Sequence, residues 1–366
     1  MAIPVTLNVG TNFDRRLVDG LARLNEKYAG GPRRVTETFG SLSGVNPIGT
    51  ARPDFRLTGG TLDDLRVYVT DSRAAGIELN YTLNTSVVDP RMLKAHEGEI
   101  TDFLGALQDV GVRRVIVAHP LVAQVVAALS TLPIELSTIL QIRHPRQLDE
   151  LVTRIGPKRI DKLCLDVFAN RNARLLSDLG RAGRRLGIAL EALTNEFCVY
   201  ECPDRNACYD IHALNLSKDE TRLFGHYPMG HCIRARITQP IEWLHARFIL
   251  PQWMGIYADQ FGVRSFKVSG RTHPTSYILR VTESYLSGTY TGNLLQLWAD
   301  VENIGRLEDE YHVPRVCLDT GALDERFLRA YLDAPGMTVE QEQAHVERWY
   351  ALAHGPTSLD ERSGEP

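Results

Sequence analysis

The chain has 366 residues, of which 43% are hydrophobic, 23% charged and 8% aromatic. This is the composition of an ordinary globular protein, so disordered and fibrous classes are excluded. The formal charge of −4, from 41 basic and 45 acidic residues, provides no overall positive field to attract nucleic acid or an anionic membrane. The sequence contains neither an apolar run of roughly 20 residues nor a signal-peptide pattern, so we expect a cytoplasmic protein without membrane contact.

Eight apolar, β-branched runs recur along the chain, each bounded by turn residues and followed by a segment with helical spacing. They cover residues 5–10, 35–40, 77–84, 112–119, 134–140, 160–166, 188–195 and 263–269. Gly76, Gly111 and Gly187 each stand directly before a predicted strand, where a left-handed glycine commonly ends a helix. The alternation predicts an α/β fold, a (β/α)8 TIM barrel over residues 1–290, with a doubly wound open sheet as the alternative.

The regular alternation is interrupted twice. A long cysteine-containing insertion, 196–262, separates the seventh and eighth predicted strands, and loops of this length are usually functional or disordered. Its cysteines, histidines and aromatic residues favour order around a bound group. A C-terminal appendage, 291–366, follows the barrel and contains one predicted amphipathic helix over 339–352.

Polar residues at the carboxyl ends of barrel strands share one mouth, where the active sites of such barrels lie. On this basis the predicted catalytic residues are Asn195, His119, Lys267 and Arg271. Lys267 and Arg271 would suit a carboxylate or phosphate anchor. The alternatives are an ion pair of Lys267 with Glu191 inside the barrel, and loop solvation or helix capping for the others.

Four of the six cysteines, Cys198, Cys202, Cys208 and Cys232, fall close together in the insertion. In a reducing compartment such grouping more often indicates a metal site than disulfides. Four thiolates suit either Zn²⁺ or an iron–sulfur cluster, and the C-x3-C spacing with unequal gaps favours a [4Fe-4S] cluster. Zinc is the alternative cofactor. The isolated cysteines, Cys164 and Cys317, are expected to be core thiols.

Two further features bear on this metal site. Five histidines lie in the insertion or shortly after it, and one of them could replace Cys208 as a ligand; they are His212, His226, His231, His245 and His273. Arg205 stands where a radical-SAM motif, C-x3-C-x2-C, requires its third cysteine, which argues against that class.

Over residues 5–295 the chain resembles the U32 peptidase family. The matching residues are Asn195, Cys198, Cys202, Pro203, Arg205, Cys232, Lys267, Gly270 and Arg271. Members of this family are similar to oxygen-independent hydroxylation proteins, barrels that hold a [4Fe-4S] cluster and act on ubiquinone precursors or RNA bases. The resemblance implies ligation of a cluster by Cys198, Cys202 and Cys232, with Cys208 as the fourth ligand. The cysteine gaps differ from those of the characterised branches, so the resemblance implies no particular substrate.

The leading functional prediction is an iron–sulfur-dependent redox enzyme that hydroxylates, or otherwise oxidises, a small molecule or carrier-bound biosynthetic intermediate. One alternative is a metal-dependent hydrolase, although the chain has neither G-x-S-x-G nor H-E-x-x-H. Another is a non-catalytic, cluster-holding subunit in a homo- or hetero-dimer with a related barrel. RNA-base hydroxylation is disfavoured, because arginine pairs such as Arg33 and Arg34 lie at the end of the barrel opposite the mouth.

Overall fold

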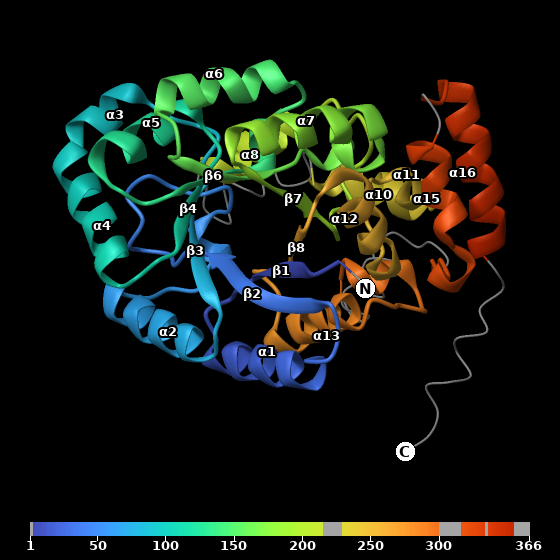
Figure 1. Cartoon of the computed structure of the whole chain (residues 1–366), viewed down its shortest axis with the longest axis horizontal. Helices are drawn as coiled ribbons and strands as arrows, with labels where there is room; N and C mark the ends of the chain where they lie inside the picture. The colour runs from blue at the N-terminus through green and yellow to red at the C-terminus, as the bar shows by residue number, and fades with distance from the viewer. Residues whose placement is uncertain (1–2, 215–228, 300–315, 334–335, 355–366) are drawn as a thin grey trace.

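The eight strands of the computed structural model form a closed, all-parallel barrel in which each strand pairs with the next and β8 pairs with β1 (Figure 1). The structure describes residues 3–214, 229–299, 316–333 and 336–354. The strands are β1 (Val5–Gly10), β2 (Arg33–Gly40), β3 (Glu78–Leu83), β4 (Arg114–Val117), β5 (Ile134–Leu136), β6 (Ile160–Cys164), β7 (Ala189–Leu193) and β8 (Ser265–Val268). The predicted TIM barrel is confirmed.

Each observed strand overlaps its predicted run, and the largest displacement of one strand end is in β5. This strand was expected to reach residue 140 but ends at Leu136. The cause is local, because the side chain of Ser137 accepts a hydrogen bond from the backbone N of Ile139 and starts a 3-10 turn, Thr138–Leu140.

Helices surround the barrel and continue beyond it (Figure 1). They are α1 (Arg15–Lys27), α2 (Leu62–Ala74), α3 (Pro90–Ala95), α4 (Glu97–Asp109), α5 (Pro120–Leu129), α6 (Pro145–Ile155), α7 (Ala173–Leu186), α8 (Arg205–Ala213), α10 (Met229–Thr238), α11 (Glu242–His245), α12 (Met254–Phe261), α13 (Thr275–Ser287), α15 (Glu325–Leu332) and α16 (Val339–Ala353). Gly187 ends α7 with a φ of 70°, the left-handed conformation expected there. No helix in the described part of the chain combines the length and hydrophobicity needed to cross a membrane.

The inside of the barrel holds a network of charged side chains. Lys162 lies 3.1 Å from Glu191, and Lys267 lies 3.2 Å from the other oxygen of Glu191. Lys267 also pairs with Glu135, and Lys162 pairs with Glu37. The insides of such barrels are usually filled by branched apolar residues. Buried charges are tolerated only when paired, so this network sets the relative positions of five strands.

The insertion and the appendage share one aromatic core with the barrel. Phe248 stacks on Trp253 with ring centroids 5.7 Å apart, and Phe327 of α15 stacks on Trp253 at the same separation. Phe197, directly before Cys198, stacks on Phe248 at 5.4 Å. The predicted C-terminal helix is observed as α16, and its Ala353 carbonyl accepts a hydrogen bond from the Asp319 backbone N. The appendage therefore supports the segment that carries the first cysteine of the group.

Candidate functional site

A cavity of about 230 Å³ opens at the carboxyl ends of the strands, where β7, β8 and the insertion meet. Cys198, Cys208 and Cys232 line it. A smaller cavity of about 90 Å³ lies next to it toward the barrel interior, and its lining includes Cys164 and Lys267. The two cavities share six lining residues, Phe39, Arg52, Glu196, Tyr209, Ser269 and Arg271. The structure thus brings three of the four grouped cysteines to the barrel mouth.

Different elements of the insertion position these cysteines. Cys198 follows the buried Phe197, Cys208 lies on α8, and Cys232 lies on α10. Cys202 is not among the residues lining either cavity, but it lies close enough to Cys208 and Cys232 for a thiolate charge at Cys202 to raise the pKa of both. All four thiols are free of disulfides, as are Cys164 and Cys317. Cys164 is buried as expected, whereas Cys317 is half-buried.

Arg236 connects two of the cysteine-bearing segments. One turn after Cys232 on α10, its Nη2 lies 3.4 Å from Cys232 Sγ and its Nη1 donates to the Phe197 carbonyl. The guanidinium also stacks over the Trp243 ring, 4.7 Å from its centroid. Because Arg236 is itself only 3% exposed, its charge acts on the thiols with little screening by solvent.

Burial is the main influence on the protonation of these thiols. It raises the pKa of Cys208 to about 11, and it raises the pKa values of Cys198 and Cys232 as well. Arg236 opposes the rise at Cys198 and Cys232, and Arg205 also opposes it at Cys198. Without a bound cation the three thiols are therefore protonated near neutral pH, so binding of a metal or cluster must release their protons.

Arg271 is the predicted mouth residue most open to a ligand. Its guanidinium donates to Thr82 Oγ1 at 2.6 Å and to Thr50 Oγ1 at 3.0 Å, and within the described residues it has no carboxylate partner. Burial, together with the nearby charge of Arg52, lowers the pKa of Arg271. Gly10, at the end of β1, makes this position possible, because a Cβ there would lie 2.8 Å from the Arg271 backbone N.

Lys267 lines the deeper cavity, and its ammonium is held by Glu135 and Glu191. The ion pair with Glu191, weighed as the alternative for this residue, is therefore present. Lys267 also lies over the Phe39 ring, 4.3 Å from its centroid. Its role in catalysis stays a prediction.

Asn195 and His119 make contacts that hold the backbone. Asn195 Nδ2 donates to the carbonyls of Ser269 and Leu297, at 3.0 and 3.1 Å, and its Oδ1 accepts from the Ser269 backbone N at 2.7 Å. His119 caps α5 by accepting from the Leu121 backbone N at 3.1 Å, and it lines neither mouth cavity. Catalytic roles for both residues stay predictions.

Two of the five histidines in or after the insertion face the mouth. His212 and His273 line the larger cavity, and burial, with smaller effects of Arg52 and Arg56, lowers the pKa of His212 to about 3. His212 is thus a neutral imidazole, the form that binds metals. His245 lies instead 3.9 Å from Glu342 of α16. His226 and the side chain of His231 lie outside the described residues.

The sequence reading missed several residues of the site. Arg52 and Tyr209 line both mouth cavities. Arg52 lies in a segment without a motif, whereas Tyr209 directly follows Cys208, a position that could have identified it. Glu135 stands in the middle of a short apolar strand, and a charge at such a position is a signal that could have identified it. With Cys164 and Glu191 it forms a group of donor atoms within 4.8 Å of one another.

The chain is distantly similar to several known proteins. No family model matches it. An uncharacterized protease of Methanocaldococcus jannaschii is 23% identical over 308 residues, covering 84% of this chain and 86% of the relative. Among solved structures, a U32 peptidase is similar with a TM-score of 0.46 and 16% identity, covering 63% of this chain and 85% of the other. An enolase from the Sargasso Sea environmental genome gives 0.38 and 14%, over 75% of this chain and 56% of the other. The resemblance to the U32 peptidase family is confirmed as a distant similarity.

Proposed function

We propose that the mouth cavity is the active site of an iron–sulfur-dependent redox enzyme. In this proposal Cys198, Cys202, Cys208 and Cys232 hold a [4Fe-4S] cluster, and the substrate is an anionic small molecule or carrier-bound intermediate that is hydroxylated without O₂. The observation that carries the proposal is that cysteines from three separate segments line one cavity together with Arg271, a guanidinium without a carboxylate partner among the described residues.

The spacing of the thiols favours a cluster over zinc. A tetrahedral zinc site with Zn–S bonds of about 2.3 Å holds its sulfurs about 3.8 Å apart. Among the described residues, Glu135, Cys164 and Glu191 have potential ligand atoms that all lie within 4.8 Å of one another. No three of the four grouped cysteines, all of which lie in the described part of the chain, have their sulfurs this close together. An iron–sulfur cluster spans its ligands more widely than a single ion does, and it suits this wider arrangement.

The surrounding charges also suit an anionic cluster. Arg236 lies against Cys232, and Arg205 acts on Cys198 from a buried position where it pairs with Asp166 at 2.7 Å. Hydrogen bonds and positive charges near the sulfurs stabilise thiolate ligands. A bound cluster would supply one-electron transfer, and hydroxylation with water as the oxygen source releases two electrons and two protons to an external acceptor for each product.

The protein residues have separate tasks in this proposal. Arg271 and Arg52 bind the carboxylate or phosphate of the substrate, Arg271 through its paired N–H groups. Tyr209, which lines both cavities, orients the substrate between the cysteines and the barrel interior. Lys267 lines the deeper cavity and is held by two glutamates, so it keeps a fixed position at the floor of that cavity while its charge is compensated.

The second candidate function is metal-dependent hydrolysis, which the names of the two peptidase relatives favour. A hydrolase needs a metal with an open position or an activated nucleophile. His212 lines the cavity together with the thiols as a neutral imidazole. In such a hydrolase, His212 and some of the cysteines would together bind a zinc ion. A dimer with a related barrel stays a prediction under either function.

Anaerobic purification with iron and sulfide quantitation and a visible spectrum tests the proposal. We expect about four irons and four sulfides per chain, and loss of the absorbance in Cys198→Ala, Cys202→Ala, Cys208→Ala and Cys232→Ala. Cys317→Ala and Cys164→Ala are the matched controls, and both should keep the colour. A colourless protein with stoichiometric zinc would reject the cluster and support the hydrolase.

A further inference from the structure

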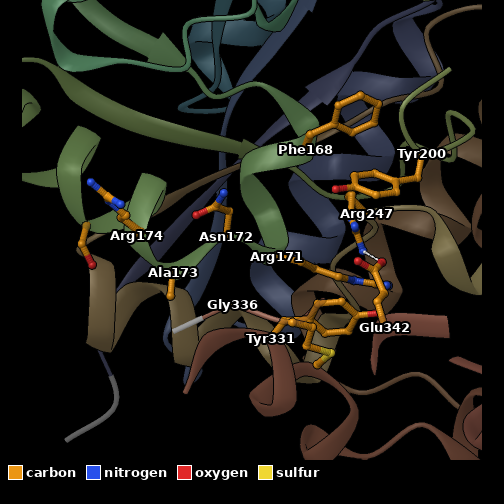
Figure 2. A pocket seen from close by; sticks show the side chains of 12 residues that line it. Phe168, Arg171, Asn172, Ala173, Arg174, Tyr200, Arg247, Tyr331, Gly336 and Glu342 are labelled. Carbon is orange, nitrogen blue, oxygen red and sulfur yellow. Dashed lines mark ion pairs between the residues drawn. The ribbon is translucent and has the colours of Figure 1, made fainter. Parts of the chain in front are cut away.

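A second, larger cavity of about 440 Å³ lies where the appendage meets the barrel (Figure 2). It is bounded by the start of α7, by Tyr200 of the segment between Cys198 and Cys202, and by residues of α15 and α16. None of its lining residues lines either mouth cavity. It is therefore a separate compartment, and the proposed function does not use it.

Positive charge exceeds negative charge in the walls of this cavity. Three arginines, Arg171, Arg174 and Arg247, line it together with one carboxylate, Glu342. Figure 2 shows Arg171 and Arg247 converging on Glu342, and Arg247 lies 2.7 Å from that carboxylate. One glutamate cannot neutralise two buried guanidinium groups, so the wall keeps an uncompensated positive charge.

Arg171 has hydrogen-bonding capacity to spare. It is 5% exposed, and its Nη1 donates to the Leu244 carbonyl at 2.7 Å. Its Nε and Nη2 have no hydrogen-bond partner among the described residues. The rings of Phe248, Phe327 and Tyr331, with centroids 4.6–5.0 Å from the guanidinium carbon, hold the group in place. Buried donors without acceptors are costly, and a bound anion nearby would offset part of that cost.

The amino end of α7 supplies a second attraction for an anion. Asn172, Ala173 and Arg174, the N-cap and first two residues of this 14-residue helix, line the cavity. The first N–H groups of a helix have no acceptor within the helix, and the helix dipole adds positive potential there. Helix amino ends of this kind bind phosphate and carboxylate groups.

We propose that this cavity binds a small molecule that carries an oxyanion, either a carboxylate or a phosphate. The oxyanion lies between the amino end of α7 and the arginines, and the apolar part of the molecule packs on Phe168, Tyr331 and Met337. Tyr200 links the cavity to the cysteine segment, because the Arg247 guanidinium lies 3.5 Å from its ring centroid. A bound molecule therefore also restrains the backbone between Cys198 and Cys202.

The test uses the full-length protein and two probes, inorganic phosphate and benzoate, titrated separately by calorimetry. Binding of phosphate alone identifies a phosphate ligand, and tighter binding of benzoate identifies a carboxylate with an apolar body. Met337→Trp fills the cavity and should abolish binding. Arg174→Gln, a surface change, should weaken binding about threefold to tenfold, as expected for loss of one charged contact.

Two variants serve as matched controls. Met92→Trp changes an exposed methionine on α3, and Arg185→Gln changes another exposed arginine of α7, one that pairs with Asp149 and not with Asp178, the partner of Arg174. Both should bind the probes as the unmodified protein does. Failure of both probes to bind, or equal binding by Met337→Trp and Met92→Trp, would overturn the proposal.

Hydrogen exchange of the protein with and without each probe then locates the bound oxyanion. We expect protection at residues 172–177, four of which line this cavity, and in the segment 198–202, whose Tyr200 lines it. Protection confined to the segment around Arg271 would place the oxyanion in the mouth cavity and reject the second site. Since the two cavities share no lining residues, failure here leaves the cluster proposal unaffected.

Discussion

Lys267 and Glu135 form an ion pair across the inside of the barrel, although they lie on strands β8 and β5 and are 132 positions apart in sequence. Lys267 also contacts Glu191 on the neighbouring β7. Both glutamates are completely buried. Lys267 pairs with both of them, and Glu191 is also paired with Lys162. The position of one of the predicted catalytic residues is thus coupled to the stability of the barrel.

Lys267→Met should destabilise the protein, because Glu135 loses its ion-pair partner and must either keep a buried charge or take up a proton. Breaking a buried ion pair in this way commonly costs about 3–5 kcal/mol. Urea unfolding followed by circular dichroism measures the change. Lys27→Met is the matched control, since it removes the lysine of another Lys–Glu pair, with Glu283, whose side chains are 61% and 38% exposed. It should leave the unfolding midpoint nearly unchanged. Equal midpoints for the two variants would show that the interior network does not stabilise the barrel.

Glu135 predicts a pH dependence of stability. Burial, strengthened by the charge of Glu191, raises the pKa of Glu135 to about 7, well above the value of about 4.3 expected in the unfolded chain. Glu135 therefore binds its proton more tightly in the folded state than in the unfolded chain. The contribution of Glu135 to the unfolding free energy grows by about 2 kcal/mol as pH falls from about 7.5 to 5. We expect the unfolding free energy of the unmodified protein to gain this amount over that of Glu135→Gln across the same range.

Comparing the two proteins removes the contributions of other titrating groups. Burial lowers the pKa values of His119 and His345. Their contribution to the stability of the folded protein therefore decreases as pH falls, but it decreases equally in both proteins. A constant difference in unfolding free energy between pH 7.5 and 5 would contradict a raised pKa at Glu135.

Periodicity carried most of the information about the fold. The eight apolar runs and the glycines at helix ends, such as Gly187, are local features, and each predicted strand appears in the barrel. The end of β5 was missed because a single side-chain hydrogen bond from Ser137 decides it. Local patterns therefore located the elements, whereas individual contacts determined their ends.

The candidate site could be predicted only in part. Cysteine grouping and strand ends led to Cys198, Cys208, Cys232 and Arg271, which do line one cavity. The loop containing Arg52 carries no motif, and Arg236 gains its position only when α10 packs against Phe197. The second cavity depends on the appendage packing beside α7, a long-range contact that no spacing in the sequence encodes.

A substitution at Asn195 can distinguish a catalytic role of this residue from a structural one. Its side chain makes four hydrogen bonds that join the end of β7 to Ser269 and Leu297. Asn195→Leu should cost about 2 kcal/mol of unfolding free energy, because it leaves the backbone N–H and carbonyl of Ser269 without these partners, whereas the Leu297 carbonyl keeps the hydrogen bond from Tyr277. Chemical denaturation measures the loss. Asn206→Ala, at an exposed position on α8, should have little effect on stability. A fully stable Asn195→Leu protein would argue that the residue is kept for chemistry instead.

Arg236 should control how firmly the proposed cluster is held. Arg236→Gln removes the positive charge beside Cys232 Sγ and the contact with the Phe197 carbonyl, so the protein should lose iron more readily. Outer groups of this kind commonly change metal affinity by about 10–100-fold. Iron retained after dialysis against a chelator, normalised to protein, is the measurement.

Arg234→Gln is the control for this variant, because Arg234 is an exposed arginine one half-turn earlier on the same helix. It should retain iron as the unmodified protein does. Far-ultraviolet circular dichroism checks that both variants keep their helices. If both proteins retain iron equally, the guanidinium of Arg236 does not stabilise the thiolates, and its contacts serve only to pack α10 on Trp243.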